Sequence, residues 1–171
     1  MVSHNLPQQA TAFIGRDREL SAIAERLADP ACRLLTWLGP GGIGKNRLAI
    51  QAATSQPAHF VNGIAFVALA PVVSPDFLAA AIGGALEMPF WGAEEPLSQL
   101  IQYLRDKQML LVMDNVEHLW AGIECLSVLL QAASYLYSRA AQKVTYYACK
   151  KCTFLALVSI PVTKYCGRLS G

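Results

Sequence analysis

The sequence lacks several features that mark broad classes of protein. No uncharged apolar run reaches the length of about 18 residues that a membrane-spanning helix needs, so we expect no membrane span. The opening residues, Met1-Val2-Ser3-His4-Asn5, are not a basic start followed by an apolar stretch, and we therefore expect no secretory signal. The five cysteines show no framework spacing. Together these absences predict reduced thiols and a cytoplasmic location.

Acidic residues are missing from the last part of the chain. Residues 134–171 contain six Lys/Arg and no Asp/Glu, whereas residues 1–133 contain eight Lys/Arg and twelve Asp/Glu. The same tail holds five of the six tyrosines and three of the five cysteines. This shift in composition predicts three parts: a polar lead-in over 1–12, a domain over 13–133, and an atypical basic tail over 134–171.

Helical apolar stripes and short apolar runs alternate through residues 13–133. The periodicity predicts helices over 16–27, 45–53, 75–86, 97–106 and 117–133, and buried strands over 33–38, 64–69 and 109–114. Buried strands that alternate with helices are typical of an α/β domain whose parallel sheet is covered on both faces.

A glycine-rich motif of the form G-x-x-x-x-G-K stands between the first predicted strand and the following helix. Glycines let successive backbone N–H groups turn toward phosphates, the helix start adds its positive dipole end, and the lysine contacts the β- and γ-phosphates. The alternative is a glycine-rich strand-to-helix turn with a surface lysine. The nucleotide-binding interpretation assigns Gly39, Pro40, Gly41, Gly42, Ile43, Gly44, Lys45, Asn46 and Arg47 to the cofactor site.

Position 46 departs from the motif, which has Ser or Thr there to bind Mg²⁺ through a hydroxyl. Asn46 offers an amide oxygen on a longer side chain, and Mg²⁺ tolerates such changes of geometry poorly. We therefore expect nucleotide binding in which Mg²⁺ is handled weakly.

A second acidic position ends the strand predicted over 109–114. Because carboxyl ends of parallel strands face the ligand crevice, Asp114 is expected to hold Mg²⁺ together with Asn46, and Glu117 to orient a water. Asp114 and Glu117 are thus the candidate catalytic residues. The alternative is that Asp114 and Asn115 form only a turn or a helix cap.

These residues together resemble the nucleotide-binding core of bacterial STAND ATPases, the signalling ATPases of LuxR-type and SARP-type transcriptional regulators, which are related to NB-ARC and AAA+ modules. The resemblance implies a P-loop NTPase three-layer sandwich with a mostly parallel sheet, incomplete at the C-terminus, and an ATP/ADP switch with Arg16 beside the adenine and ribose. The segments that carry it are Asn5-Leu6-Pro7, Phe13 to Leu20, Leu34 to Lys45, Gly63 to Phe77 and Leu110 to Leu119.

The tail departs from this family, whose next strand should end in Thr-Ser-Arg; here Ser138-Arg139 has no apolar strand before it. Three interpretations stay open. The tail is an unrelated sequence; or 153–160 forms a buried strand in the empty sheet position; or the tail is a zinc or nucleic-acid element around Cys149, Cys152 and Cys166.

The resulting prediction is an ATP/ADP-binding module of a signalling ATPase or transcriptional regulator, with weak hydrolysis at most. The alternatives are a non-catalytic module that binds a protein partner or itself, and an inert truncated fragment. No helix-turn-helix is apparent within these 171 residues, so we expect no DNA binding by this chain.

Overall fold

The computed structural model describes residues 4–29, 32–38, 42–132 and, as backbone, 152–159. Its helices are α1 (Asp17–Ala28), α2 (Lys45–Thr54), α3 (Leu78–Ala85), α4 (Pro96–Leu104) and α5 (Ile123–Ala132), and its strands are β1 (Leu34–Leu38), β2 (Ile64–Ala68), β3 (Met109–Asp114) and β4 (Cys152–Ser159). Short 3₁₀ segments cover η1 (Pro57–His59), η2 (Pro75–Phe77) and η3 (Val116–Gly122). Over the described residues, none of the helices combines the length and the apolar character needed to cross a bilayer.

The four strands form one mixed sheet in the order β1-β4-β3-β2. β2 and β3 pair in parallel, while β4 lies between β1 and β3 and runs antiparallel to both. It follows that β1, β2 and β3 point the same way, so their carboxyl ends meet at one edge of the sheet. The register places Leu38 beside Cys152 and Asp114 beside Phe154, both near the beginning of β4.

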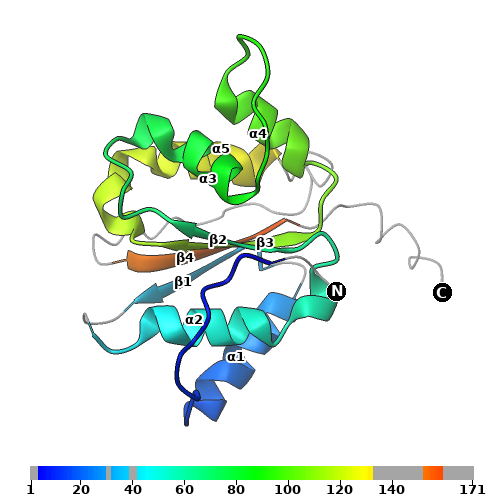
Figure 1. Ribbon diagram of the computed structural model, residues 1–171. Helices are drawn as coiled ribbons and strands as arrows, with labels where there is room; N and C mark the ends of the chain where they lie inside the picture. The colour runs from blue at the N-terminus through cyan, green and yellow to red at the C-terminus, as the bar shows by residue number, and fades with distance from the viewer. Residues whose placement is uncertain (1–3, 30–31, 39–41, 133–151, 160–171) are drawn as a thin grey trace, which may run out of the picture.

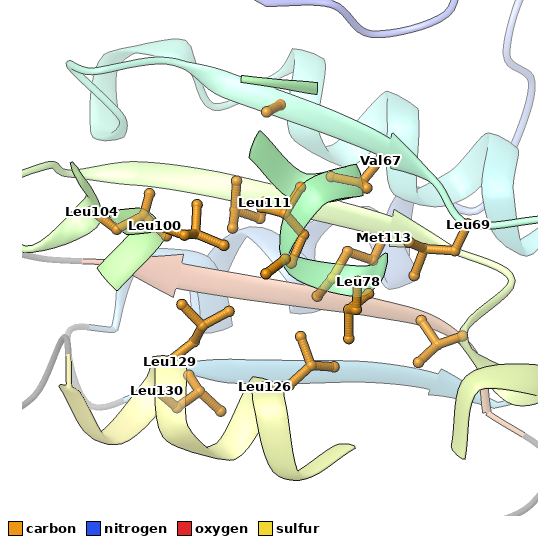
Figure 2. Packing of buried hydrophobic residues seen from close by; sticks show 14 of the residues in the cluster. Val67, Leu69, Leu78, Leu100, Leu104, Leu111, Met113, Leu126, Leu129 and Leu130 are labelled. Carbon is orange, nitrogen blue, oxygen red and sulfur yellow. The ribbon is translucent and has the colours of Figure 1, made fainter. Parts of the chain in front are cut away.

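Helices cover both faces of this sheet, with α3, α4 and α5 on one side and α1 and α2 on the other (Figure 1). β3 shows how one strand serves two cores, because side chains alternate across a pleated strand. Met109, Leu111 and Met113 belong to the cluster under α3, α4 and α5, shown in Figure 2. Leu110 and Val112 belong to the opposite cluster, with side chains of α1 and α2. A strand buried on both faces explains the uninterrupted apolar run.

The lead-in lies along the outer edge of β2. His4 forms an isolated parallel bridge with Ile64, and the side chain of Asn5 both accepts from Phe66 N–H and donates to Phe66 C=O at 3.0 Å. The same Asn5 amide also donates to Ala85 C=O at 3.1 Å. These contacts cover backbone groups of β2 that a strand at the edge of a sheet would otherwise leave unpaired.

The predicted elements of 13–133 are all present, with bounds within a few residues, but three features differ from expectation. The helix predicted over 75–86 begins as 3₁₀ η2, where Ser74 Oγ accepts from Asp76 N–H, and becomes α-helical only at Leu78. The helix predicted over 117–133 is η3 followed by α5, since the backbone of Leu119 leaves helical geometry. The sheet also contains an antiparallel strand, β4, that a mostly parallel sheet did not predict.

The strand expected over 153–160 corresponds to β4, so the second interpretation of the tail describes the backbone that is seen. Its direction differs from the three other strands, and the sheet accommodates this because antiparallel and parallel ladders can share a strand. Arg139, Cys149 and Cys166 lie outside the described residues, as does the tail's nucleic-acid or zinc interpretation that depends on them.

Candidate functional site

The glycine-rich turn enters α2 through a backbone that only glycine adopts readily. Gly42 and Gly44 have φ values of 78° and 83°, in the left-handed region, where a side chain is strained. Gly44 is also the N-cap of α2 and provides no side-chain cap. The N-cap thus gives the first turn of α2 no side-chain acceptor, an arrangement that favours an anion at the helix start. Gly39, Pro40 and Gly41 lie outside the described residues.

Lys45 is the first residue of α2 and is buried, with only 8% of its surface exposed. This differs from the alternative in which the lysine of a simple glycine-rich turn lies on the surface. Its charge acts on the carboxylate of Asp114, where it lowers the pKa against larger opposing effects. A buried ammonium at a helix start, close to an acidic strand end, is suited to a polyanionic ligand.

Asn46 contacts the residue that ends β3. Its Nδ2 donates a hydrogen bond of 2.6 Å to Oδ2 of Asp114, so the two positions assigned to the metal site lie side by side. An ionised carboxylate can only accept, which fixes the amide nitrogen rather than the amide oxygen toward Asp114. Here Asn46 is therefore a donor to Asp114, and its oxygen points elsewhere. A role as metal ligand would require the amide to rotate and give up this bond.

Two carboxylate oxygens of the site have no hydrogen-bond partner among the described residues. They are Oδ1 of Asp114 and Oε2 of Glu117, and both atoms are buried. A buried carboxylate oxygen left unpaired is costly and is normally satisfied by a proton, a water or a cation. Asp114 therefore fits a Mg²⁺ ligand through Oδ1, whereas Asn46 in its present orientation does not.

Burial also raises the pKa of the Asp114 carboxyl above its ordinary value. The N–H of Asn115 and the amide of Asn46 donate to the carboxylate and oppose this rise, while the nearby charge of Glu117 adds to it. The same residue is held by its main chain, since its C=O accepts from Leu69 N–H at 3.1 Å and Asn115 then turns away with φ 61°. Tethering of this kind gives Asp114 a defined position at the carboxyl edge of the sheet.

Arg16 reaches the glycine-rich turn from the start of α1. Its backbone is left-handed, with φ 62°, and its Nη2 donates to the C=O of Ile43 at 2.7 Å. The residue expected to lie beside a nucleotide base is thus joined to the turn expected to hold the phosphates.

Arg47 turns away from the turn and binds the lead-in. Its Nη2 donates to the C=O of Thr11 and of Ala12 at 2.7 and 2.6 Å, and its guanidinium lies 5.9 Å from the centre of the Phe13 ring. Gln9 completes the contact, accepting from Arg47 Nε and donating to Arg47 C=O, each at 3.1 Å. The charged group of Arg47 is thus committed to residues 9–13, and a contact of Arg47 with a cofactor stays a prediction.

Sequence reasoning missed both of these side-chain networks. The Asn46–Asp114 bond joins positions that are distant in sequence, and the motif reserves position 46 for a metal ligand rather than for a donor. Gln9 carried no signal, since a glutamine in a polar lead-in is compatible with any surface role. Over the described residues, no group of three or more His, Cys, Asp or Glu side chains is placed to hold a metal. Mg²⁺ at phosphate sites commonly relies on one or two carboxylates, so this observation does not bear on Asp114 alone.

Comparison with known proteins places the chain beside segments of larger bacterial proteins. It is 34% identical over 118 residues to an uncharacterized protein of Mycobacterium tuberculosis, covering 69% of this chain and 30% of that protein. It is 37% identical over 101 residues to a candidate HTH-type transcriptional regulator of the same organism, covering 59% of this chain and 11% of the regulator. A WD repeat-containing protein of Nostoc is 30% identical over 119 residues, or 61% of this chain and 9% of that protein.

The chain thus spans about a third or less of the length of these relatives. No family model matches the chain, and no solved structure matches it. The chain is therefore similar to one segment of a bacterial protein described as a candidate transcriptional regulator, and the comparison shows no more than this.

Proposed function

We propose that this chain is an ATP/ADP-binding module of the P-loop type, a three-layer α/β domain of the STAND class that acts within a signalling ATPase or transcriptional regulator. The observation that carries the proposal is the 2.6 Å bond between Asn46, in the first turn of α2, and Asp114, at the end of β3. It joins the start of α2 to the end of β3 at the carboxyl edge of the sheet, the two elements that would form a phosphate site. The buried Lys45 and the uncapped start of α2 support an anionic ligand there.

The proposed roles follow from the donors present. Gly42, Ile43 and Gly44 would offer backbone N–H groups to the phosphates, and Lys45 would add its charge. Mg²⁺, when bound, would neutralise phosphate charge, and Oδ1 of Asp114 would be its protein ligand. Glu117 would accept a hydrogen bond from a water through its unpaired Oε2. Arg16 would line the site through its bond to the turn.

Hydrolysis is proposed to be slow at most. Phosphoryl transfer needs the developing charge to be neutralised by metal ions and cationic side chains. Position 46 supplies a donor to Asp114 where the motif supplies a metal ligand. The family's arginine that senses the γ-phosphate follows an apolar strand, and in this sequence Ser138-Arg139 only echoes that motif, with no apolar strand before it. We therefore propose that the module signals by whether ATP or ADP is bound, rather than by rapid hydrolysis.

The test is thermal unfolding with and without ADP or ATP, each in Mg²⁺ and in EDTA, for the wild type and Lys45→Ala. A ligand at about 100 times its Kd that binds only the folded state stabilises it by about 2.7 kcal/mol. We expect a nucleotide-dependent rise in Tm that disappears in Lys45→Ala. The matched control is Lys107→Ala, which removes a lysine that lies 4.1 Å from the Tyr103 ring, after α4, and should keep the rise. Absence of any rise in a cooperatively folding wild type would contradict nucleotide binding.

A protein-interaction module is the second candidate, and exposed apolar side chains favour it. Val73, Phe77 and Trp91 are 88%, 57% and 73% exposed. Exposed apolar side chains without nucleotide binding would fit a module that acts by docking to a protein. The same experiment separates the two, since an interaction module folds cooperatively but shows no dependence on nucleotide or on Lys45.

A further inference from the structure

The amide of Asn46 occupies one carboxylate oxygen of Asp114. The Nδ2 to Oδ2 distance of 2.6 Å is that of a strong, charge-assisted hydrogen bond. A hydroxyl at position 46 could coordinate a cation while leaving both Asp114 oxygens available. The amide group instead consumes one of them, and an amide nitrogen that carries two hydrogens has no lone pair to give to a metal.

Rotation of the Asn46 amide would present its oxygen to a cation but would also break the bond to Asp114. Oδ2 of Asp114 would then lose this donor while Oδ1 already lacks a partner among the described residues, so the partly buried carboxylate would be less well satisfied. A hydrogen bond to a charged group is among the more costly ones to lose. A divalent cation that uses the Asn46 oxygen must therefore offset this cost, and a cation that leaves the bond in place has only Oδ1 of Asp114 as a ligand from these two residues.

The rest of the phosphate-binding apparatus does not depend on a metal. The buried ammonium of Lys45 and the uncapped N–H groups of α2 supply positive potential by themselves. The donor from Asn46 also partly compensates the charge of Asp114, which would otherwise repel a phosphate.

Building on the proposed function, we propose that Asn46 makes this a nucleotide site that does not depend on Mg²⁺, one that takes the nucleoside phosphate equally well with or without the cation. Its amide does for Oδ2 of Asp114 what the cation does at a site with Ser or Thr in that position: it satisfies this oxygen and keeps the end of β3 joined to the first turn of α2. Mg²⁺ therefore adds no affinity for ADP.

The experiment is calorimetric titration of the full chain with ADP, in Mg²⁺ and in EDTA, for the wild type and Asn46→Thr. We expect the same Kd in both conditions for the wild type, and a Kd that tightens by about tenfold or more on addition of Mg²⁺ for Asn46→Thr. Asn62→Thr is the matched control. It loses the 2.7 Å bond from Gln108 N–H to Asn62 Oδ1 just before β2, at the opposite edge of the sheet, and should behave like the wild type.

A wild type that gains as much from Mg²⁺ as Asn46→Thr overturns the inference while leaving nucleotide binding in place. No ADP binding by either protein in either condition overturns the proposed function and the inference with it. A second measurement needs no variant to fold: the side-chain NH₂ resonance of Asn46 in the ADP complex of the wild type should stay unchanged on addition of Mg²⁺. A shift of that resonance with Mg²⁺ would show that the amide yields to the cation and would also overturn the inference.

Discussion

Gly83 of α3 lies against the ring of Phe90, so close that a Cβ at position 83 would be 2.3 Å from the ring Cζ and 2.6 Å from Cε2. Real atoms do not approach to that distance, so Gly83→Ala must displace the ring or the helix. We expect a loss of about 1–3 kcal/mol in the free energy of unfolding, the usual cost of overpacking. Denaturant unfolding followed by circular dichroism measures it.

The neighbouring residue gives the control for this prediction. A Cβ at Gly84 meets nothing within 4 Å, so Gly84→Ala removes only the flexibility of a helical glycine. It should raise stability, by up to about 1 kcal/mol. A Gly83→Ala variant as stable as Gly84→Ala would show that the Phe90 ring does not pack closely against Gly83.

Replacement of Asp114 by asparagine should make the folded protein less sensitive to pH in EDTA and without nucleotide. Burial raises the pKa of Asp114 in the folded state, so the folded state holds this proton more tightly than the unfolded state does. Stability from this group is complete below the unfolded pKa and is lost as pH rises through the folded pKa. The amide introduced by Asp114→Asn keeps an oxygen to accept from Asn46 but carries no charge.

We therefore expect Asp114→Asn to be the more stable protein at neutral pH, by less than about 1 kcal/mol because the carboxyl is partly screened by solvent. The difference in unfolding free energy should shrink as the pH falls. The measurement is the difference between variant and wild type across a pH series, which cancels the other carboxylates. A variant that is less stable at neutral pH would contradict the prediction.

Arg47 should hold the lead-in to α2. Arg47→Ala removes both donors to the C=O groups of Thr11 and Ala12 and the bond to Gln9. We expect a loss of about 1–3 kcal/mol, as for hydrogen bonds to a charged group, and faster amide exchange over residues 9–13. Arg47→Lys keeps the charge but lacks the planar guanidinium, so its free energy of unfolding should lie between those of the wild type and Arg47→Ala. Unchanged exchange in Arg47→Ala would show that the lead-in is held by its Asn5 contacts alone.

Truncation should reveal how much the sheet depends on β4. β1 pairs only with β4 among the described strands, so a chain of residues 1–133 leaves β1 without a partner in the sheet. We expect that chain to lose cooperative thermal unfolding, whereas a chain of residues 1–159 keeps it because β4 is retained. Differential scanning calorimetry distinguishes them. A sharp transition in the shorter chain would mean that β1 and β3 pair directly when β4 is absent.

The order of elements could be predicted well because burial on both faces leaves an unmistakable pattern. The run from Met109 to Met113 contains no polar residue, and the pleat sends its side chains into both cores. The helix that starts at Lys45 was likewise predicted from the motif that ends there. These signals are local, so they can be read without knowing what lies across the sheet.

The direction of β4 and the role of Asn46 could not be predicted, since each depends on a partner distant in the chain. An apolar segment such as 152–159 can form the strand between β1 and β3 in either direction. Only its pairing with these neighbours decides between parallel and antiparallel. Asn46 was expected to act toward a ligand, and in the fold its amide donates to Asp114. Contacts of this kind appear only when the fold brings the two side chains together.

The position of β4 sets the order in which this protein can mature. During synthesis β1 and β3 leave the ribosome well before β4, and each then carries a row of unpaired N–H and C=O groups. Pairing between β1 and β4 closes a loop that contains nearly all of the domain, which is slow and costly in chain entropy. The nascent chain therefore exposes these strand edges until residues 152–159 have been made, an interval in which unpaired edges favour aggregation.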